Sequence, residues 1–320
     1  MQKVKKRYRV RLEFKGPVHF GYKEKTYNIT DVFAHSDTIF SGILNCYSLL
    51  YGKTSADALA EKFFKSPPFK ISSAFLYAGG EFFVPKPLDM DLTHITGDYK
   101  KAKKIRYVPL EFILGEHPKG QPQGEYKLES GILTKQTMKK PYFILERPRV
   151  VIDRKSSSTE IYYVSGCYFA KNAGLWFFLD ICDNAEEEKV KAAIRLLGDE
   201  GLGGERTYGF GSFNAYFDEV PLNSVESNKT LGDWLLLSLY FPAEGEDVGE
   251  SVKAFSFVER GGYSYSPFGV QMRKKRVRML AEGSVFRKRV EGAILDVSLG
   301  SDTEHKVLKY GLAYMLPFVR

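Results

Sequence analysis

The sequence predicts an α+β fold, because a strand–helix–strand pattern near the start of the chain returns before residue 220. A repeat of this kind is typical of a ferredoxin-like, or RNA-recognition-like, domain. The 320 residues are 43% apolar, which allows one large domain or two ordinary ones with a substantial core. The pattern is clearest at residues 7–15, a predicted strand, and at residues 183–198, a predicted helix.

The first strand is expected at residues 7–15, where apolar and charged residues alternate strictly. A period of two places Tyr8, Val10 and Leu12 on the buried face and leaves a basic outer face. A helix is expected in the segment AHSDTIFSGILNCYSLLYG, with Ser36 or Asp37 as its N-cap and Gly52 just after its end. Further strands are expected at 71–77 and 81–84, joined by a glycine turn.

Residues 85–148 interrupt this regular pattern. They contain seven of the fourteen prolines and no long amphipathic period. Long irregular segments inside a domain tend to be functional. We interpret this segment as an insertion into the first domain, in the form of a projecting β-hairpin or thumb.

Regular patterning returns in RPRVVIDR, EIYYVSGCYFA and GLWFFLDI, all of which are typical of strands. The next helix is expected to begin at Asp183 or Asn184 and to end at Gly198. A glycine-rich loop and a strand follow it. A polar, turn-rich segment at 219–230 suggests a boundary between a first domain, 1–220, and a mostly β second domain, 221–320.

The charge and cysteine content limit the class of protein. A net charge of +8, with basic stretches at 3–11, 100–106 and 273–278, favours a polyanionic partner. The three cysteines include no Cys-x-x-Cys pair, which suits a reducing compartment. No apolar signal core and no run of about 18 apolar residues occur. We therefore expect a soluble, cytoplasmic protein without a membrane segment.

The glycine loop, in GDEGLGGERTYGFGSF, follows a helix and leads into a strand. A Walker-type loop has the opposite order and ends in Gly-Lys-Ser/Thr, and the dinucleotide fingerprint fails for the same reason. No nucleotide cofactor is therefore expected. The loop can present backbone N–H groups and the Arg206 guanidinium to a nucleic-acid backbone. The alternative is a wide, bulged turn without a ligand.

Four segments in this order form a recognisable set: HSDTIFSGI, RPRVVIDR, GLGGERTYGFGSF and KYGLAYMLPF. The set resembles the RAMP superfamily of CRISPR-associated proteins. More closely, it resembles the subunit of the type III-A Csm effector complex that caps the 5′ end of the guide RNA. The glycine loop is common to all RAMP proteins, whereas HSDT, PRVVIDR, GSVF and YGLA indicate this particular subunit.

The resemblance implies two ferredoxin-like domains, the first carrying the thumb, and a non-catalytic, RNA-binding role. It implies that the chain grips the 5′ tag of the guide (CRISPR) RNA, lies close to the target RNA, and docks the large Palm-domain subunit and the backbone RAMP subunit. The residues expected to contact RNA are Gly201, Gly203, Gly204, Glu205, Arg206, Thr207, Tyr208, Gly209, Gly211, His35, Ser36, Asp37, Arg147, Arg149 and Arg154. Further contacts with RNA or a partner are expected at Lys100, Lys101, Lys103, Lys104, Arg106, Arg273, Lys274 and Lys275.

His35 raises the alternative of a metal-independent endoribonuclease that processes CRISPR precursor RNA. The processing members of the superfamily use a histidine near their first helix as general acid–base. Two observations oppose this reading: N-capping explains the Ser36–Asp37 pair, and over a hundred residues follow the glycine loop, where those enzymes usually end. Asp153 has no second carboxylate at readable spacing, and its arginine neighbours suggest an ion pair or a phosphate contact. The histidines lack metal-ligand spacing, so no metal is expected.

Overall fold

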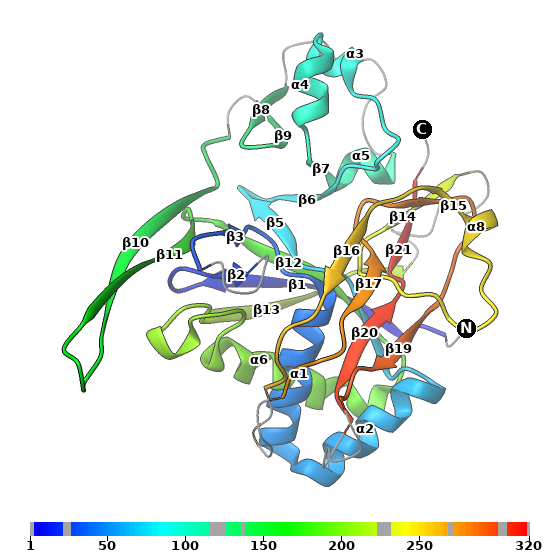
Figure 1. The fold of residues 1–320 in the computed structure, drawn as a ribbon. Coiled ribbons are helices and arrows are strands. Elements are labelled where there is room, and N and C mark those ends of the chain that lie inside the picture. Colours follow the sequence, from blue (N-terminus) through cyan, green and yellow to red (C-terminus); the bar gives the residue numbers. More distant parts are fainter. Residues whose placement is uncertain are drawn as a thin grey trace.

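A large sheet forms the centre of the first part of the chain. The computed structural model describes residues 3–21, 27–115, 126–135, 138–222, 232–265, 267, 272–299 and 306–318. The strands of the sheet are β1 (Lys6–Phe14), β4 (Phe69–Ile71), β5 (Phe75–Ala78), β6 (Glu81–Pro85), β7 (Tyr107–Pro109), β8 (Tyr126–Glu129), β9 (Ile132–Lys135), β12 (Ala173–Ile181) and β13 (Phe213–Glu219). Their order is β13-β1-β12-β5-β6-β7-β9-β8, with β4 also paired to β12 (Figure 1). A two-stranded ribbon of β2 (Phe20–Gly21) and β3 (Thr30–Asp31) follows β1.

Strand β1 is the predicted alternating strand, and it lies between the edge strand β13 and β12, antiparallel to both. Tyr8, Val10 and Leu12 are buried, as expected. The prediction of a basic outer face is wrong at Arg7. That side chain is buried and pairs with Asp180 through two hydrogen bonds of 2.6 and 2.7 Å, because the C-terminal part of the chain covers this end of the sheet.

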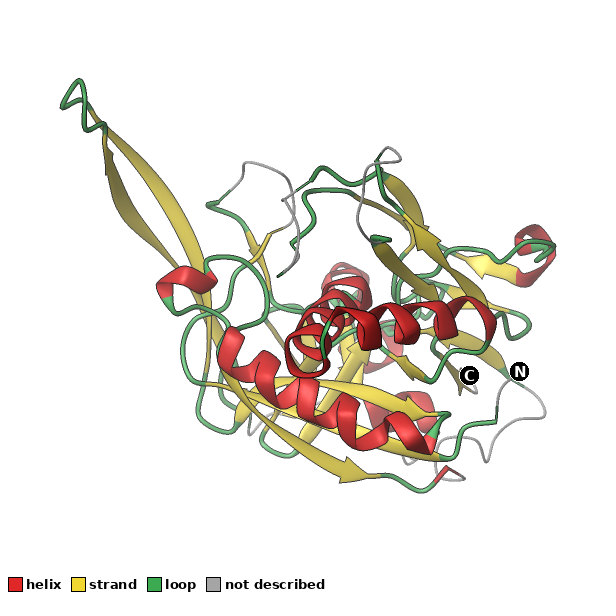
Figure 2. Ribbon diagram, turned by 90° about the horizontal axis from the view of Figure 1, so that it is seen from below, coloured by secondary structure: helices red, strands yellow, loops and turns green. Residues whose placement is uncertain are grey.

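Three long helices cover one face of the sheet: α1 (Ser36–Tyr51), α2 (Lys53–Lys65) and α6 (Glu187–Glu200). Figure 2, seen from below, shows them in front of the strands. A short 3-10 turn, η1 (Asn184–Glu186), precedes α6, and Asp183 caps it as predicted. Helix α6 continues past Gly198, contrary to expectation. A Cβ atom at Gly198 would lie 2.3 Å from the Phe213 carbonyl oxygen, so this glycine allows the helix to approach β13.

The N-cap of α1 is His35, not Ser36 or Asp37, which are already inside the helix. Gly52 ends α1 as predicted and directly begins α2, which the sequence did not predict.

A long insertion separates the neighbouring strands β5 and β12. Its first part adds β6 to β9 to the sheet and contains three short helices, α3 (Thr93–Thr96), α4 (Tyr99–Lys104) and α5 (Leu110–Leu114). Its second part is a hairpin of β10 (Tyr142–Ile152) and β11 (Thr159–Phe169), which extends far from the body (Figure 1). The projecting hairpin therefore lies at 142–169, whereas the sequence placed it within 85–148. Alternation alone cannot distinguish strands whose apolar residues are exposed from strands of the core.

The C-terminal part, residues 232–318, consists mainly of short antiparallel strands, as predicted. They are β14 (Asp233–Leu236), β15 (Val252–Ala254), β16 (Phe257–Arg260), β17 (Val277–Leu280), β18 (Val285–Phe286), β19 (Gly292–Asp296), β20 (Leu308–Leu312) and β21 (Met315–Phe318). Among its described residues the one helix is α8 (Val248–Ser251), so no helix pair of a ferredoxin-like unit is seen there. The expected boundary at 219–230 lies mostly outside the described residues.

Candidate nucleic-acid interface

The inner half of the glycine loop, residues 201–204, packs against its own chain. Gly203 has a φ of 102°, and a Cβ atom there would lie 2.5 Å from the carbonyl oxygen of His19. The backbone N–H of Gly204 donates to the same oxygen over 2.8 Å. Close packing against the segment before β2 thus explains why these positions are glycine. An RNA contact at Gly203 or Gly204 stays a prediction.

The outer half of the loop, residues 205–209, faces solvent. It contains a single 3-10 turn, η2 (Arg206–Tyr208), bounded by Glu205 and Gly209, both in the left-handed conformation. No heavy atom lies within 4 Å of a Cβ atom built at Gly209. The Tyr208 side chain is 64% exposed, which is high for a large aromatic residue. This half of the loop is therefore available to a ligand, in contrast to the inner half.

The hairpin β10–β11 contacts the outer half of the loop through Arg149. The Arg149 guanidinium lies 4.0 Å from the centroid of the Tyr208 ring, and its Nη1 atom pairs with a Glu205 carboxylate oxygen at 2.5 Å. The sequence predicted both segments as RNA-binding but gave no indication that they meet. The structure brings them together into one surface.

The C-terminal part contacts the same loop from the other side. The Arg206 guanidinium lies 4.6 Å from the centroid of the Tyr265 ring. Tyr265 and its neighbour Tyr263 are both more than half exposed. Two arginines and several exposed tyrosines therefore lie along one stretch of surface. Proteins that bind single-stranded nucleic acid use cations to contact phosphates and aromatic rings to stack on bases.

The start of α1 has a different environment. Ser36 is fully buried, and its hydroxyl accepts a hydrogen bond of 3.0 Å from the backbone N–H of Leu239. The Asp37 carboxylate pairs with Arg260 at 2.9 and 3.0 Å and with Lys309 at 2.9 Å. Ser36 has no exposed surface for the RNA contact expected from the sequence. Both residues fasten the first helix to the C-terminal part.

The ionisation of Asp37 follows from these neighbours. Burial alone raises the pKa of the Asp37 carboxyl, but the positive charges of Arg260 and Lys309 outweigh burial and hold that pKa well below its usual range. The group is a charged component of the interface between the two parts of the chain.

His35 is also engaged inside the molecule. Its Nδ1 atom lies 2.9 Å from the Glu282 carboxylate, which also accepts a hydrogen bond from the Ser73 hydroxyl, and its ring packs edge-on against Phe33. Burial raises the pKa of Glu282, whereas the interaction with His35 lowers it, and the net shift is downward. The His35 side chain is 13% exposed. The geometry favours a structural histidine over one that faces RNA.

The remaining basic candidates are dispersed. The exposed residues Lys100, Lys101, Lys103 and Lys104 belong to α4 or its end, which Figure 1 places at the top of the molecule, away from α6 and the loop that follows it. Arg147 lies over the Tyr168 ring, on the hairpin. Arg154 is exposed in the turn of the hairpin, Arg106 is exposed after α4, and Arg273 and Lys275 are exposed after residue 271.

For Asp153 the sequence predicted an ion pair or a phosphate contact involving its arginine neighbours. An ion pair with Arg149 is not formed, because Arg149 pairs with Glu205. The phosphate contact stays a prediction. Asp153 accepts hydrogen bonds from the backbone N–H groups of Lys155 and Ser156, and these bonds lower the pKa of Asp153. Its role is to close the turn of the hairpin.

Sequence reasoning missed His19, Arg260, Tyr263 and Tyr265. The last three lie in ERGGYSYSP, where a glycine pair precedes tyrosines that alternate with serines. That composition is the one available signal. In the ranges that the structure describes, no group of three or more His, Cys, Asp and Glu residues could hold a metal ion. Nor does any helix there combine the length and apolar character needed to cross a membrane.

Comparison with known families agrees with this architecture. The RAMP superfamily matches residues 11–214, which include the glycine loop and the large sheet apart from the start of β1 and most of β13. The chain therefore belongs to the RAMP superfamily. Residues 229–318 match the CRISPR Csm4 C-terminal domain. Together the two matches group the chain with the Csm4 proteins within that superfamily.

Curated relatives cover nearly the whole chain. The CRISPR system Cms protein Csm4 of Thermococcus onnurineus is 28% identical over 295 residues, 88% of this chain and 90% of the relative. The protein of the same name from Mycobacterium tuberculosis is 27% identical, covering 91% of each chain. Among solved structures, the Csm3-Csm4 subcomplex of the type III-A CRISPR-Cas interference complex matches with a TM-score of 0.68 at 20% identity, over 98% of this chain and 100% of the other. A Csm1-Csm4 cassette in complex with cA4 matches with a TM-score of 0.62 at 23% identity, over 98% of each chain. At these identities the structural matches establish the fold.

Proposed function

We propose that this chain is the non-catalytic subunit of a type III-A CRISPR interference complex that grips the 5′ tag of the guide RNA. In this proposal it also docks the large Palm-domain subunit and the backbone RAMP subunit. Membership of the RAMP superfamily and the similarity to Csm4 proteins support it. Similar proteins have been solved together with Csm1 and with Csm3, which supports two protein partners.

The observation that carries the RNA-binding role is the surface around the outer half of the glycine loop. Arg149 comes from the hairpin, Arg206 and Tyr208 from the loop, and Tyr265 from the C-terminal part. Arginine binds phosphate through a planar fork of donors and also stacks on aromatic rings and bases. Such a surface suits a single strand, whose bases are free to stack, better than a duplex.

The strand order supports the ferredoxin-like topology implied by the resemblance for the first domain. Counted along the chain, β1, β5, β12 and β13 are the first to fourth strands, and they lie in the order 4-1-3-2 with antiparallel neighbours. Helices connect the first strand to the second and the third to the fourth. In this reading the insertion occupies the connection between the second and third strands, and the hairpin β10–β11 is the thumb.

The direct test is whether the purified protein carries a guide RNA with a fixed 5′ sequence. We expect Tyr208→Ala to weaken binding of that RNA about 10-fold, because a stacked base contributes roughly 1–3 kcal/mol. Arg206→Ala should lower the slope of log affinity against log salt by about one unit. Tyr99→Ala is the matched control, since Tyr99 is 67% exposed on α4. Equal binding by all variants would remove this surface from the RNA path.

The competing function, a processing nuclease with His35 as general acid–base, makes a separate prediction. Because His35 faces Glu282 inside the molecule, we expect no cleavage of CRISPR repeat RNA by the purified chain. Cleavage that disappears in His35→Ala would favour the nuclease instead. Cleavage that persists in this variant would exclude His35 as the general acid–base.

A further inference from the structure

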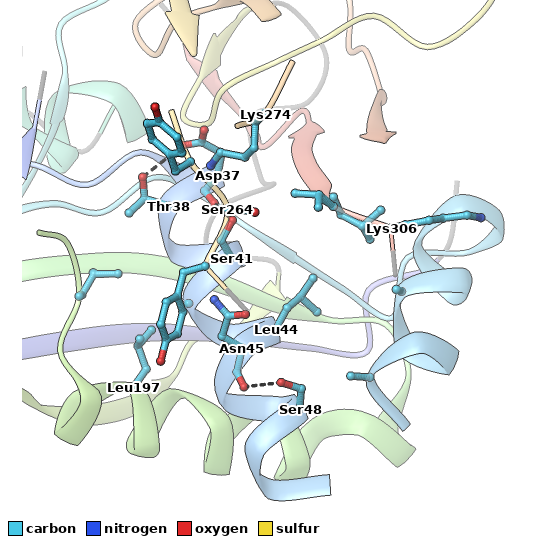
Figure 3. Close-up of a pocket in the computed structure, with 18 of the residues that line it drawn as sticks. Asp37, Thr38, Ser41, Leu44, Asn45, Ser48, Leu197, Ser264, Lys274 and Lys306 are labelled. Carbon is cyan, nitrogen blue, oxygen red and sulfur yellow. Dashed lines mark hydrogen bonds between the residues drawn. The ribbon is translucent and has the colours of Figure 1, made fainter. Parts of the chain in front are cut away.

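A cavity of about 320 Å³ lies between α1, α2, the inner half of the glycine loop and the segment after β16 (Figure 3). It is separate from the exposed surface of Arg149 and Tyr208, neither of which lines it, but Arg206 contributes to both. Ligand pockets span about 300–1,000 Å³, so this one is at the lower end of the range. The space suits a single nucleotide unit and excludes a helical stretch of RNA.

Lys274 is the distinctive group in this cavity. Figure 3 shows it at the Asp37 end of the space, while Asn45 and Ser48 lie further along α1. Asp37 itself is already paired with Arg260 and Lys309. Among the described residues, no ion pair or side-chain hydrogen bond holds the Lys274 ammonium. A half-buried cation without an anionic partner favours the binding of an anionic ligand, because the ligand supplies the charge that the partly desolvated cation lacks.

The charged groups that act on the Lys274 ammonium come from three elements. Burial lowers the pKa of the Lys274 ammonium to about 8, and the charge of Lys309 on β20 acts in the same direction. Arg260 on β16 also lowers this pKa, whereas Asp37 on α1 opposes the shift. The other charged residues that line the cavity are Lys53, Asp57, Arg206 and Lys306.

The remaining walls suit a base. Tyr263 and Tyr265, both more than half exposed, provide aromatic side chains, and Leu44 and Leu202 provide apolar surface. Ser41, Asn45 and Ser264 provide donors and acceptors for a base edge or a ribose. The Arg206 guanidinium lies 4.6 Å from the centroid of the Tyr265 ring, so a cation and an aromatic ring are adjacent in this wall, a combination that nucleotide recognition uses.

We propose that this cavity binds one unpaired nucleotide, with its phosphate on Lys274 and Arg206 and its base on the Tyr265 side. The inference rests on the proposed RNA-binding function if the nucleotide belongs to a bound strand. A free nucleotide has the same chemistry, so the experiment separates the two sources. One probe is a labelled single-stranded RNA of eight nucleotides with the 5′-tag sequence, and the other is ATP alone.

Two pairs of variants of the full chain test the site. Lys274→Met removes the cation, and Lys65→Met is its control, since Lys65 is exposed at the end of α2 and does not line the cavity. Ala56→Trp fills the cavity from α2, and Ala58→Trp is the control, since Ala58 is exposed on that helix and does not line the cavity. We expect each cavity variant to weaken RNA binding about 10-fold, and each control less than 2-fold, with unchanged melting temperatures.

A pH profile gives a readout that a merely structural lysine would not produce. Because the Lys274 pKa is about 8, its charge is mostly present at pH 7 and mostly lost at pH 9. Wild-type affinity should therefore fall by up to about 10-fold over that range, beyond any change in Lys274→Met. Lys274→Arg keeps its charge and should keep its affinity at pH 9.

The outcomes separate the two proposals. If wild type, Lys274→Met and Ala56→Trp bind RNA equally, the proposal that this cavity binds a nucleotide is wrong. The proposed RNA-binding function is then unaffected. Binding of ATP that is lost in Lys274→Met supports the cavity with a free nucleotide as ligand, even if the RNA does not bind. Failure of both probes to bind the folded wild-type chain overturns the cavity.

Discussion

The start of α1 and the outer half of the glycine loop were both expected to face RNA, yet they occupy opposite environments. Asp37 is buried and neutralised by two cations from the C-terminal part, whereas Tyr208 projects into solvent beside Arg149. In the sequence, both residues looked available to a ligand: Asp37 is a polar residue at the start of a helix, and Tyr208 lies in a glycine-rich loop. The difference teaches that polar residues of a family motif can serve internal contacts, here between the first helix and the C-terminal part of the chain.

The largest expected effect comes from breaking the buried side of this comparison. Arg260→Met leaves the Asp37 carboxylate with Lys309 alone, and breaking a buried ion pair typically costs about 3–5 kcal/mol. We expect this loss in the free energy of unfolding, measured by denaturant titration. The control is Tyr208→Ala, an exposed residue whose loss should cost below about 0.5 kcal/mol. Equal stabilities of the two variants would contradict the contrast between the two environments.

An intermediate effect is expected within the glycine loop itself. Gly203 and Gly209 both have positive φ angles, of 102° and 80°. A Cβ atom at Gly203 would lie 2.5 Å from the His19 carbonyl oxygen, whereas a Cβ atom at Gly209 would have no neighbour within 4 Å. Gly209→Ala should cost roughly 1 kcal/mol, from conformation alone. Gly203→Ala adds a clash with His19 and should cost roughly 3 kcal/mol. Thermal unfolding of both variants measures the difference, and an inner half that tolerates alanine as well as the outer half would argue against self-packing.

The smallest effect is the acid dependence of the buried cluster. Because the pKa of Asp37 is depressed in the folded chain, its stabilisation is complete above the unfolded value near 4 and is lost as the pH falls below it. Asp37→Asn should therefore be less stable than wild type at pH 6, and the gap should narrow between pH 5 and pH 3. Melting temperatures over this range provide the measurement. For Tyr208→Ala we expect a curve parallel to that of wild type.

Local patterns were sufficient for much of the fold. The alternation around Val10 and the helical spacing from Val190 to Leu197 each depend on neighbours in sequence, and both elements were correctly predicted. Helix α2 was missed because its amphipathic pattern begins directly at Gly52, where the preceding helix ends. The hairpin was misplaced because exposed residues such as Val150 and Ile161 resemble those of a core strand.

The candidate site was harder to predict because its geometry is tertiary. Arg206 was predicted from its place in the glycine loop, but its partner Tyr265 lies 59 residues further along the chain, in the C-terminal part. Asp37 was assigned to RNA, because the two cations that neutralise it lie more than 220 residues away. Sequence spacing cannot reveal such pairings. The sequence can indicate which residues have charged or polar side chains, but not which of those side chains already pair within the folded chain.

Strand β1, which lies between β12 and β13 in the large sheet, leaves the ribosome long before either of these neighbours. Leu12 pairs with Leu175 in β12, and Tyr8 pairs with Glu219 in β13, so more than 160 residues must be made first. At about 5–20 residues per second, the first partner strand arrives roughly 10–30 s later. Until then Val10 and Leu12 remain exposed to solvent. Arg9 precedes Val10, and Arg11 lies between Val10 and Leu12. Charges interleaved with apolar residues discourage pairing with other nascent chains, so the same alternation protects the polypeptide during its synthesis.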